Sequence, residues 1–330
     1  MPVRNARSTL ASSLESIRRQ RGVDWECVAV DDGSSDGSLR LLEEYAARDT
    51  RVRLLARPAR GIVASLSEGL GACRGRYVAR MDADDVMLRE RLRTQVAALE
   101  HDPELSGVGC HVRIFPRTGL RARRLEYEAW LNSLRGDADV ARDAFVECPL
   151  AHPTLLLRRE VLEHHPYRDH GWPEDYDLIL RLLGAGLRLG VVPRRLLCWR
   201  DGAARLSRTS ASYSLSAFTA CKAQHLANRY LARRSEYVLW GYGKTGSSLA
   251  RALLGHGKRP RVIVEVHPGR IGQRILGAPV IAPDRLLDFS QPGEGPPVIA
   301  SVARAGPRAE LRAALDALGF QELRDYVCAA

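Results

Sequence analysis

The sequence predicts an α/β protein with two domains, and three observations support this. Two strand-like segments, in residues 25–47 and 77–99, each run into a turn rich in aspartate and then into a helix. A third strand–turn–helix unit begins at residue 237 and has glycines in its turn. The length of 330 residues suits two domains, and an apolar content of 45% is ordinary for a chain with a real core.

The first unit places two carboxylates at the end of a strand. Residues 25–30 have the apolar character of a buried strand, residues 31–38 are rich in Gly, Ser and Asp, and residues 39–47 follow as a helix. Ligands of open α/β sheets bind at the carboxyl ends of the strands. Asp31 and Asp32 are therefore candidate binding residues.

The second unit carries three carboxylates in four positions, Asp82, Asp84 and Asp85, after the strand at 77–79. Acids at this spacing raise each other's pKa unless a cation neutralises them. Mg²⁺ in phosphate-handling enzymes commonly sits on one or two carboxylates, with a substrate diphosphate completing its shell. The turn is a candidate metal site. The other interpretation is that Asp84 or Asp85 caps a helix beginning near Leu88.

Five segments occur in the order found in family 2 glycosyltransferases. They are residues 2–6, 30–38, 61–69, 80–85 and 172–177. Over residues 1–210 the sequence resembles this family, and the specificity lies in the ordered set, since one Asp-x-Asp alone is weak. The resemblance implies a GT-A fold and transfer of a sugar from a nucleotide-diphosphate donor to an acceptor hydroxyl, usually with inversion at the anomeric carbon.

The resemblance also implies how the donor nucleotide is held. Its base and ribose would lie against Pro2, Val3 and Asn5 and against the turn of Asp31 and Asp32. Asp32 is the favoured hydrogen-bond partner of the base.

The same resemblance assigns the second acidic turn. Asp82 would face the ribose and the metal, and Asp84 is the first choice as ligand to Mg²⁺ or Mn²⁺. Asp85 would orient its neighbours or cap the helix. A bound metal would offset the charge that grows on the leaving nucleotide.

An inverting transfer needs a base that takes the acceptor proton. Residues 172–177 resemble the Glu-Asp motif of the family, which implies that Asp175 is the base, with Glu174 beside it as a possible contact to acceptor or diphosphate. A helix over residues 178–183 would anchor them. The alternative is a cluster of acids that favours the helix dipole.

Further positions carry two interpretations each. His152, in a His-Pro pair before a strand at 155–157, either lines the acceptor side or is a hydrogen-bonded turn histidine. Arg200 and Ser207 resemble a segment that closes over the donor diphosphate. An arginine suits a diphosphate through its forked donors, whereas many surface arginines are simply solvated.

Three departures from the family are visible. Position 4 is arginine where the family commonly has an aromatic residue, and position 67 is serine where asparagine is usual, so base stacking is expected to differ. The apolar strand that normally precedes the Pro-Val pair is nearly absent. We therefore expect the full protein to carry a few more strand residues before Met1.

Charge and hydropathy limit the binding partners and the cellular compartment that we expect for this protein. The net charge of +11 comes mostly from arginine and would attract a nucleotide-sugar donor or an anionic membrane surface. No nucleic-acid module is recognisable, so nucleic acid is not expected as a partner. Without an apolar run of membrane-spanning length or a signal peptide, we expect a cytoplasmic protein, with peripheral contact to the inner membrane face as an option.

The seven scattered cysteines are expected to be reduced, and the oligomeric state is not indicated.

A helical linker is predicted over residues 211–234 and a second domain over residues 235–330. Its first strand, at 237–240, runs into Gly241, Gly243, Lys244 and Gly246, and Glu265 follows 24 residues after Gly241. This is near the spacing at which an acid meets a ribose in dinucleotide-binding folds. The segment resembles the small Rossmann-like domains found beside sugar-modifying acyltransferases.

Two interpretations of this second domain stay open. Its turn binds NAD(P) or another nucleotide, with Lys244 at a phosphate, or its glycines serve tight strand-to-helix packing. Two function classes follow. The leading one is a metal-dependent glycosyltransferase acting on a saccharide or lipid-linked acceptor, and the rival is a nucleotide-dependent oxidoreductase or nucleotide-sensing module centred on the C-terminal domain.

Overall fold

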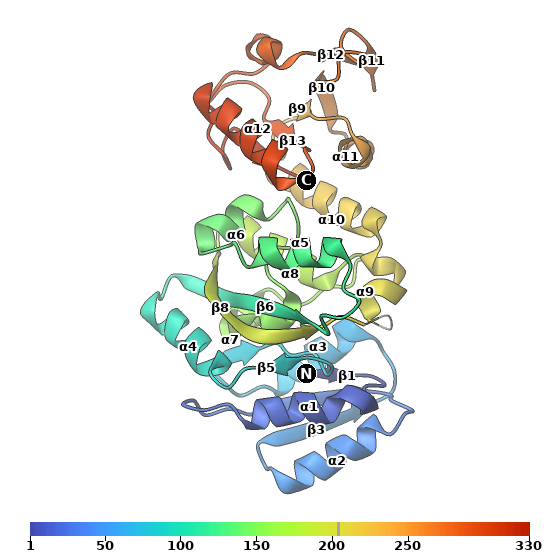
Figure 1. Cartoon of the computed structure of the whole chain (residues 1–330), viewed down its shortest axis with the longest axis vertical. Coiled ribbons are helices and arrows are strands. Elements are labelled where there is room, and N and C mark those ends of the chain that lie inside the picture. Colours follow the sequence, from blue (N-terminus) through green and yellow to red (C-terminus); the bar gives the residue numbers. More distant parts are fainter. Residues whose placement is uncertain (203–204) are drawn as a thin grey trace. The chain divides into compact units, whose positions relative to one another are not determined.

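The computed structural model describes residues 1–202 and 205–330, and its internal contacts divide the chain into two units (Figure 1). Unit 1 comprises Met1–Ala141, Pro149–His170 and Asp177–Thr209, and unit 2 comprises Arg142–Cys148, Gly171–Tyr176 and Ser210–Ala330. The last boundary lies beside the predicted linker start at residue 211. The segments 142–148 and 171–176, which fall in the predicted first domain, belong to unit 2 instead.

Unit 1 begins with a three-stranded parallel sheet in the order β1-β2-β3. Its strands are β1 (Pro2–Val3), β2 (Cys27–Asp32) and β3 (Val52–Arg57), and its helices are α1 (Arg7–Arg18), α2 (Ser38–Arg48) and α3 (Ile62–Ala72). Leu10, Leu14 and Ile17 recur at helical spacing and are buried, so α1 presents one apolar face to the core. α1 packs against α2, and α3 packs on β2.

A mixed five-stranded sheet in the order β4-β7-β6-β8-β5 completes unit 1. The strands are β4 (Tyr77–Ala79), β5 (Val86–Met87), β6 (Leu105–Phe115), β7 (Leu156–Arg158) and β8 (Arg188–Arg200). β5 pairs antiparallel with β8, with Val86 opposite Cys198. The two strands that carry the acidic turns, β2 and β4, therefore belong to different sheets.

The second acidic turn does not lead directly into a helix. It leads into β5, and the helix predicted from Leu88 is α4 (Arg91–His101), with Glu90 at its N-cap. Asp84 and Asp85 lie before β5, so the helix-capping interpretation of either residue is wrong. The remaining helices of this region are α5 (Ala122–Leu131), α6 (Asp137–Asp143), η1 (His152–Thr154), α7 (Arg159–His164), α8 (Glu174–Gly184) and α9 (Leu206–Thr209).

A cavity of about 420 Å³ lies between the two sheets of unit 1. Met1, Pro2 and Val28 line one side, and β4 lines the other with Tyr77 and Val78. β1 and β4 are the end strands of their sheets, so within the described residues two open strand edges face one mostly apolar space.

Unit 2 contains a six-stranded sheet in the order β11-β12-β10-β9-β13-β14, parallel except for β11. Its elements are η2 (Ala211–Tyr213), α10 (Leu215–Asn228), β9 (Glu236–Trp240), α11 (Lys244–Leu254), β10 (Arg259–Val264), β11 (Arg274–Ile275), β12 (Ala278–Ile281), η3 (Pro283–Asp288), β13 (Val298–Ala300), α12 (Ala305–Ala317) and β14 (Tyr326–Cys328). Val238, Val262 and Val298 are fully buried in its core. α10, within the predicted linker, packs against α11 and ends at Asn228 and not at residue 234.

All seven cysteines are free thiols, and five of them are buried. Across residues 1–202 and 205–330, none of the helices combines the length and the apolar character needed to cross a bilayer.

Candidate active site

The first acidic turn is fastened to the loop that follows β1. Asn5, in a left-handed conformation with φ of 49°, accepts a hydrogen bond from the N–H of Ser35 at 2.9 Å and donates its own N–H to Ser34 Oγ at 3.0 Å. Gly33 has φ of 69°, and a Cβ there would lie 2.8 Å from the main-chain nitrogen of Ala59. Only glycine fits that position, so the turn has one shape.

Asp31 and Asp32 differ in what they bind. Asp32 is buried, and its carboxylate accepts the N–H of Arg60 at 2.7 Å, the N–H of Gly61 at 3.1 Å and a guanidinium hydrogen of Arg4 at 3.2 Å. Asp31 is also buried and accepts the N–H of Ser34, but its Oδ1 has no hydrogen-bond partner among the described residues. Asp32, which was the favoured partner of the nucleotide base, is thus occupied by main-chain N–H groups just before α3. An acceptor atom remains on Asp31.

The backbone of the second acidic turn is held from α1. Ser13 Oγ donates to the carbonyl of Asp82 at 3.0 Å, and Thr9 Oγ1 donates to the carbonyl of Ala83 at 3.1 Å. The buried guanidinium of Arg91 donates to the carbonyl of Arg80 at 3.0 Å. These bonds leave the three aspartate side chains to face a common space.

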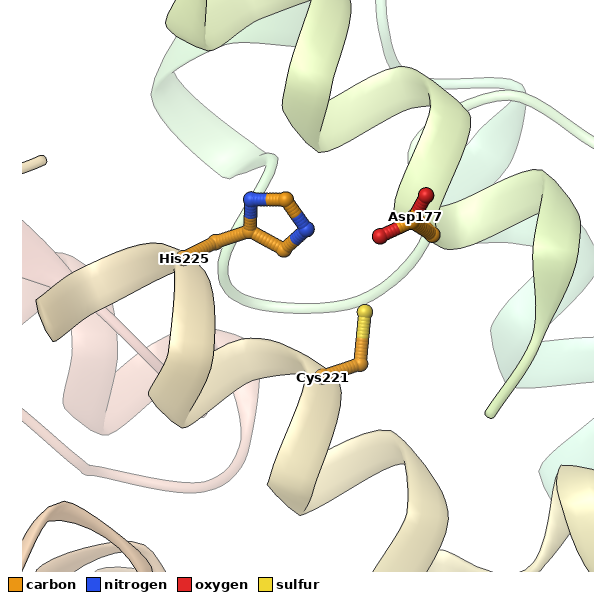
Figure 2. A group of neighbouring side chains, drawn as sticks. All are labelled: Asp177, Cys221 and His225. Carbon is orange, nitrogen blue, oxygen red and sulfur yellow. The ribbon is translucent and has the colours of Figure 1, made fainter. Parts of the chain in front are cut away.

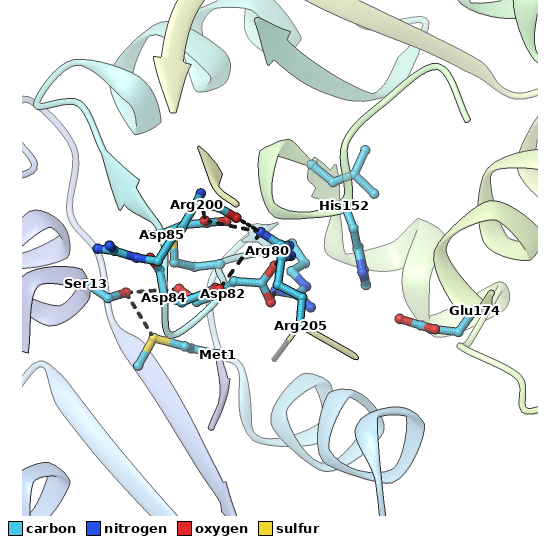
Figure 3. A network of polar contacts seen from close by, with 12 residues as sticks. Met1, Ser13, Arg80, Asp82, Asp84, Asp85, His152, Glu174, Arg200 and Arg205 are labelled. Carbon is cyan, nitrogen blue, oxygen red and sulfur yellow. Dashed lines mark hydrogen bonds and ion pairs between the residues drawn. The ribbon is translucent and has the colours of Figure 1, made fainter. Parts of the chain in front are cut away.

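The carboxylates of Asp82, Asp84 and Asp85 converge, with one oxygen of each within 4.8 Å of the others (Figure 3). The Asp82 and Asp84 side chains are 21% and 30% exposed, whereas the Asp85 side chain is fully buried. Asp85 Oδ2 has no hydrogen-bond partner in the described part of the chain. Hard divalent cations take oxygen ligands at about 2.0–2.6 Å, so three carboxylate oxygens at this separation fit one such ion.

The pKa values of these acids reflect burial and mutual repulsion. Burial and the charge of Asp82 raise the pKa of Asp85 well above its ordinary value, and the same two causes raise the pKa of Asp84. Burial also opposes ionisation of Asp82, but the charges of Arg80 and Arg205 outweigh it and lower the pKa of Asp82. A cation at this turn would therefore relieve a real electrostatic cost.

Three arginines surround the acids, and the sequence assigned only one of them to the site. Arg200 donates its N–H to Asp85 Oδ1 at 2.7 Å and its Nε–H to the carbonyl of Asp84 at 2.7 Å, so it braces the turn. Arg80 pairs with Asp82. Arg205 lies 3.5 Å from Asp82 Oδ2 and 3.9 Å from both Asp84 Oδ2 and Asp85 Oδ1. Arg80 lies in the family-like segment 80–85, whereas no local sequence pattern indicated Arg205.

His152 is buried in unit 1 and shares a 2.9 Å hydrogen bond with the hydroxyl of Tyr167. Their rings are 5.5 Å apart. This contact is the one expected of a hydrogen-bonded turn histidine. Its role toward an acceptor stays a prediction.

Glu174 and Asp175 lie in unit 2 and form the first turn of α8, so the helix begins four residues earlier than the predicted residues 178–183. Glu174 is buried and accepts a hydrogen bond from the hydroxyl of Tyr213. Asp175 Oδ1 accepts the N–H of Tyr176 at 2.7 Å. An acid at a helix N-terminus is stabilised as the anion, the form that a general base requires.

Cys221 and His225 are four residues apart on α10 and project from the same face of that helix (Figure 2). Asp177, drawn in the same figure, lies on α8 in unit 1, where its carboxylate pairs with Arg181 at 2.7 Å. Two donors from one helix are fewer than the four of a structural zinc site, so we assign no metal to the Cys221 and His225 pair.

The glycine-rich turn of unit 2 joins β9 to α11 as predicted. A Cβ at Gly246 would lie 2.0 Å from the carbonyl oxygen of Gly241, so the glycine at 246 is required for packing, whereas a Cβ at Gly243 would meet nothing within 4 Å. Glu265 is the predicted ribose partner. Its Oε2 forms an ion pair with Arg270 at 3.0 Å and accepts a hydrogen bond from the N–H of Tyr242 at 3.3 Å. Lys244 is the first residue of α11.

Comparison with known proteins shows which family the chain belongs to. The family model described as glycosyl transferase family 2 matches residues 1–165. EpsE of Bacillus subtilis, named as a glycosyltransferase, is 32% identical over 221 residues, which is 65% of this chain and 76% of EpsE. The amylovoran biosynthesis glycosyltransferase AmsE of Erwinia amylovora is 30% identical over 196 residues, 58% of this chain and 71% of AmsE.

Among solved structures, TarS residues 1–349 from S. aureus in complex with UDP-GlcNAc superimposes with a TM-score of 0.55 at 15% identity. The match covers 77% of this chain and 70% of that one. At this identity the likeness concerns the fold, and it confirms the expected GT-A type of architecture.

Proposed function

The chain belongs to glycosyl transferase family 2 and is a glycosyltransferase, and from that premise we propose that it is a metal-dependent, inverting enzyme. It moves a sugar from a nucleotide-diphosphate donor to an acceptor hydroxyl on a saccharide or lipid-linked saccharide. Its donor site is built from the two acidic turns of unit 1, and its general base comes from the start of α8.

One observation carries the metal dependence. Asp82, Asp84 and Asp85 bring three carboxylate oxygens within 4.8 Å, and the buried Asp85 Oδ2 lacks a hydrogen-bond partner within residues 1–202 and 205–330. These residues would hold Mg²⁺ or Mn²⁺, with Asp84 as the first choice because it is the most exposed of the three. Such an ion supplies Lewis-acid stabilisation of the diphosphate leaving group.

The donor nucleotide is proposed to lie along the loop of Pro2, Val3 and Asn5 and the turn at 31–38. The hydrogen bond from Ser35 to Asn5 fixes the conformation of the loop against the turn. Asp31 Oδ1 is the acceptor for a hydrogen of the base or ribose. Arg4, in place of the usual aromatic residue, is paired with Asp32. TarS has been solved with UDP and with UDP-GlcNAc, which supports a nucleotide-diphosphate sugar as the donor class.

Asp175 is the proposed general base. The N-terminal turn of α8 favours its ionised form, and its hydrogen bond from the N–H of Tyr176 orients the carboxylate. In an inverting transfer this carboxylate takes the proton of the acceptor hydroxyl as its oxygen attacks the anomeric carbon.

The relatives suggest where the product is used. AmsE is named for amylovoran biosynthesis and WbnJ of Escherichia coli for O-antigen biosynthesis, so we propose a role in a cell-surface polysaccharide. The net charge of +11 would draw the chain to an anionic membrane surface that carries lipid-linked acceptors.

A thermal-shift screen tests the donor site. Wild type should be stabilised by UDP, GDP or dTDP only when Mn²⁺ or Mg²⁺ is present, and Asp84→Ala should lose that stabilisation. Stabilisation by NAD(H) alone, lost in Gly243→Ala, would favour the oxidoreductase alternative. The named relatives are glycosyltransferases, which does not favour that alternative.

A further inference from the structure

Arg205 holds the place of a cation beside the acidic turn. Its guanidinium is in ion-pair range of Asp82, Asp84 and Asp85 at once, at 3.5, 3.9 and 3.9 Å, and its side chain is only 14% exposed. It is anchored by a hydrogen bond to the carbonyl of Arg200, and its guanidinium carbon lies 5.2 Å from the centre of the Trp199 ring. A guanidinium is thus shared among three acids without a close, two-pronged pair to any one of them.

We propose that Arg205 is an internal counter-cation of the acidic turn, and that it leaves when a divalent cation binds the same three carboxylates. The inference rests on the proposed metal site and adds to it a competitor from this chain. Asp82 Oδ2, Asp84 Oδ2 and Asp85 Oδ1 are the atoms that Arg205 neutralises, and carboxylate oxygens of the same three residues converge within 4.8 Å. A guanidinium and a divalent ion side by side would repel each other in a poorly solvated pocket.

The exchange couples metal binding to donor binding. A metal alone must expel Arg205 into solvent, whereas a nucleoside diphosphate brings its own oxygens, which match the forked donors of a displaced arginine. Metal and nucleoside diphosphate should therefore each tighten the binding of the other, and by linkage the factor is the same in both directions. Without the positive charge at position 205, the metal alone should bind more tightly and the diphosphate should add less.

Titration of Mn²⁺ followed by the EPR signal of the free ion tests this without any turnover. Arg205→Gln should bind Mn²⁺ alone about tenfold more tightly than wild type, because no guanidinium then has to be displaced from the three carboxylates. Arg205→Lys keeps the charge and should stay near wild type. Arg208→Gln is the matched control, since Arg208 lies three residues after Arg205, in α9, and pairs with Asp201 at 2.6 Å; it should change the affinity less than twofold.

Adding GDP or UDP completes the test. The nucleotide should tighten Mn²⁺ binding to wild type several-fold more than to Arg205→Gln. Equal or weaker Mn²⁺ binding by Arg205→Gln relative to Arg208→Gln would overturn the exchange while leaving the metal site intact. If wild type and Asp84→Ala are alike in failing to bind Mn²⁺ with and without nucleotide, the metal site itself and the exchange both fail. Circular dichroism of each variant verifies that it is folded.

Discussion

The main-chain N–H of Arg200 donates a 2.7 Å hydrogen bond to the buried carboxylate of Asp85, a residue 115 positions earlier in the chain. The bond ties the end of β8 to the acidic turn, and the Nε–H of Arg200 adds a second tie at the carbonyl of Asp84. A carboxylate placed here accepts one hydrogen bond but is also buried among like charges, which raises its pKa.

Asp85→Asn should therefore stabilise the fold and weaken the site. The amide oxygen still accepts the N–H of Arg200, while the cost of a buried charge beside Asp82 disappears, so we expect a gain of about 1 kcal/mol in unfolding free energy. Urea denaturation at pH 7 measures this gain, and Mn²⁺ affinity should fall. Asp85→Ala is the control, because it leaves the N–H unpaired and should lose about 1–3 kcal/mol. A stability loss in Asp85→Asn would contradict this account.

Asp175→Asn should separate chemistry from binding. Loss of a general base typically lowers the rate of transfer by about 10² to 10⁴, whereas donor and metal binding belong to the acidic turns and should change little. Single-turnover transfer and nucleotide-induced thermal shift measure the two properties. Glu174→Gln is the companion variant, because Glu174 is buried against Tyr213 and is expected to affect stability more than proton transfer. A wild-type rate in Asp175→Asn excludes Asp175 as the base.

The glycines of unit 2 should differ in their tolerance of alanine. Gly246→Ala forces a Cβ to within 2.0 Å of the Gly241 carbonyl oxygen, so a loss of about 3 kcal/mol or more is expected. Gly243→Ala meets no atom within 4 Å and should cost less than about 1 kcal/mol. Chemical denaturation compares the two. If Gly243→Ala lowers the unfolding free energy as much as Gly246→Ala does, Gly243 is closely packed and no ligand can approach it.

Local signals in the sequence sufficed for some elements and failed for others. The strand and helix on either side of the Asp31–Asp32 turn, and β9 with α11, follow from apolar runs broken by Gly and Asp, and they appear nearly where predicted. β5 could not be predicted, because its two residues are a strand only through pairing with β8, more than a hundred residues later. Arg205 could not be predicted either, because its contacts are with aspartates more than a hundred residues earlier in the chain.

The aspartate pair of the first turn shows a second limit. Residue type and spacing do not distinguish Asp31 from Asp32. In the folded chain, however, the carboxylate of Asp32 accepts the N–H groups of Arg60 and Gly61, whereas Asp31 Oδ1 has no hydrogen-bond partner among the described residues. Hydrogen-bond partners supplied by a distant loop decide which carboxylate is available, and no local pattern contains them.

Lys222 should make stability depend on pH. Its ammonium donates to the carbonyls of Val146 at 3.3 Å and Ala329 at 2.8 Å, and burial lowers its pKa from 10.5 to about 8. Between pH 8 and pH 10.5 the unfolded chain holds a proton that the folded chain has released, so the unfolding free energy rises with pH across this window. Relative to Lys222→Met, wild type should gain about 1–3 kcal/mol from pH 8 to pH 10.5.

Urea denaturation at several pH values between 7 and 10.5 gives that difference directly. Lys258→Met is the matched control, since Lys258 also donates to two main-chain carbonyls, those of Leu231 and Arg234. A pH slope that is the same for both lysine variants would show that burial at Lys222 is not its cause.

The cavity between the two sheets of unit 1 should accept a strand. Met1, Val28 and Val78 line a space of about 420 Å³ between β2 and β4, and residues added before Met1 would continue β1 into this space, beside the start of β2, at the usual strand spacing of about 4.8 Å. A chain extended by Val-Ile-Ile-Val before Met1 should gain roughly 2 kcal/mol in unfolding free energy, since buried apolar surface outweighs the ordering of four residues. An extension of Gly-Ser-Gly-Ser has the same length without the apolar surface and should gain nothing. Equal stability of the two extended chains in urea would mean that the space is closed to a strand.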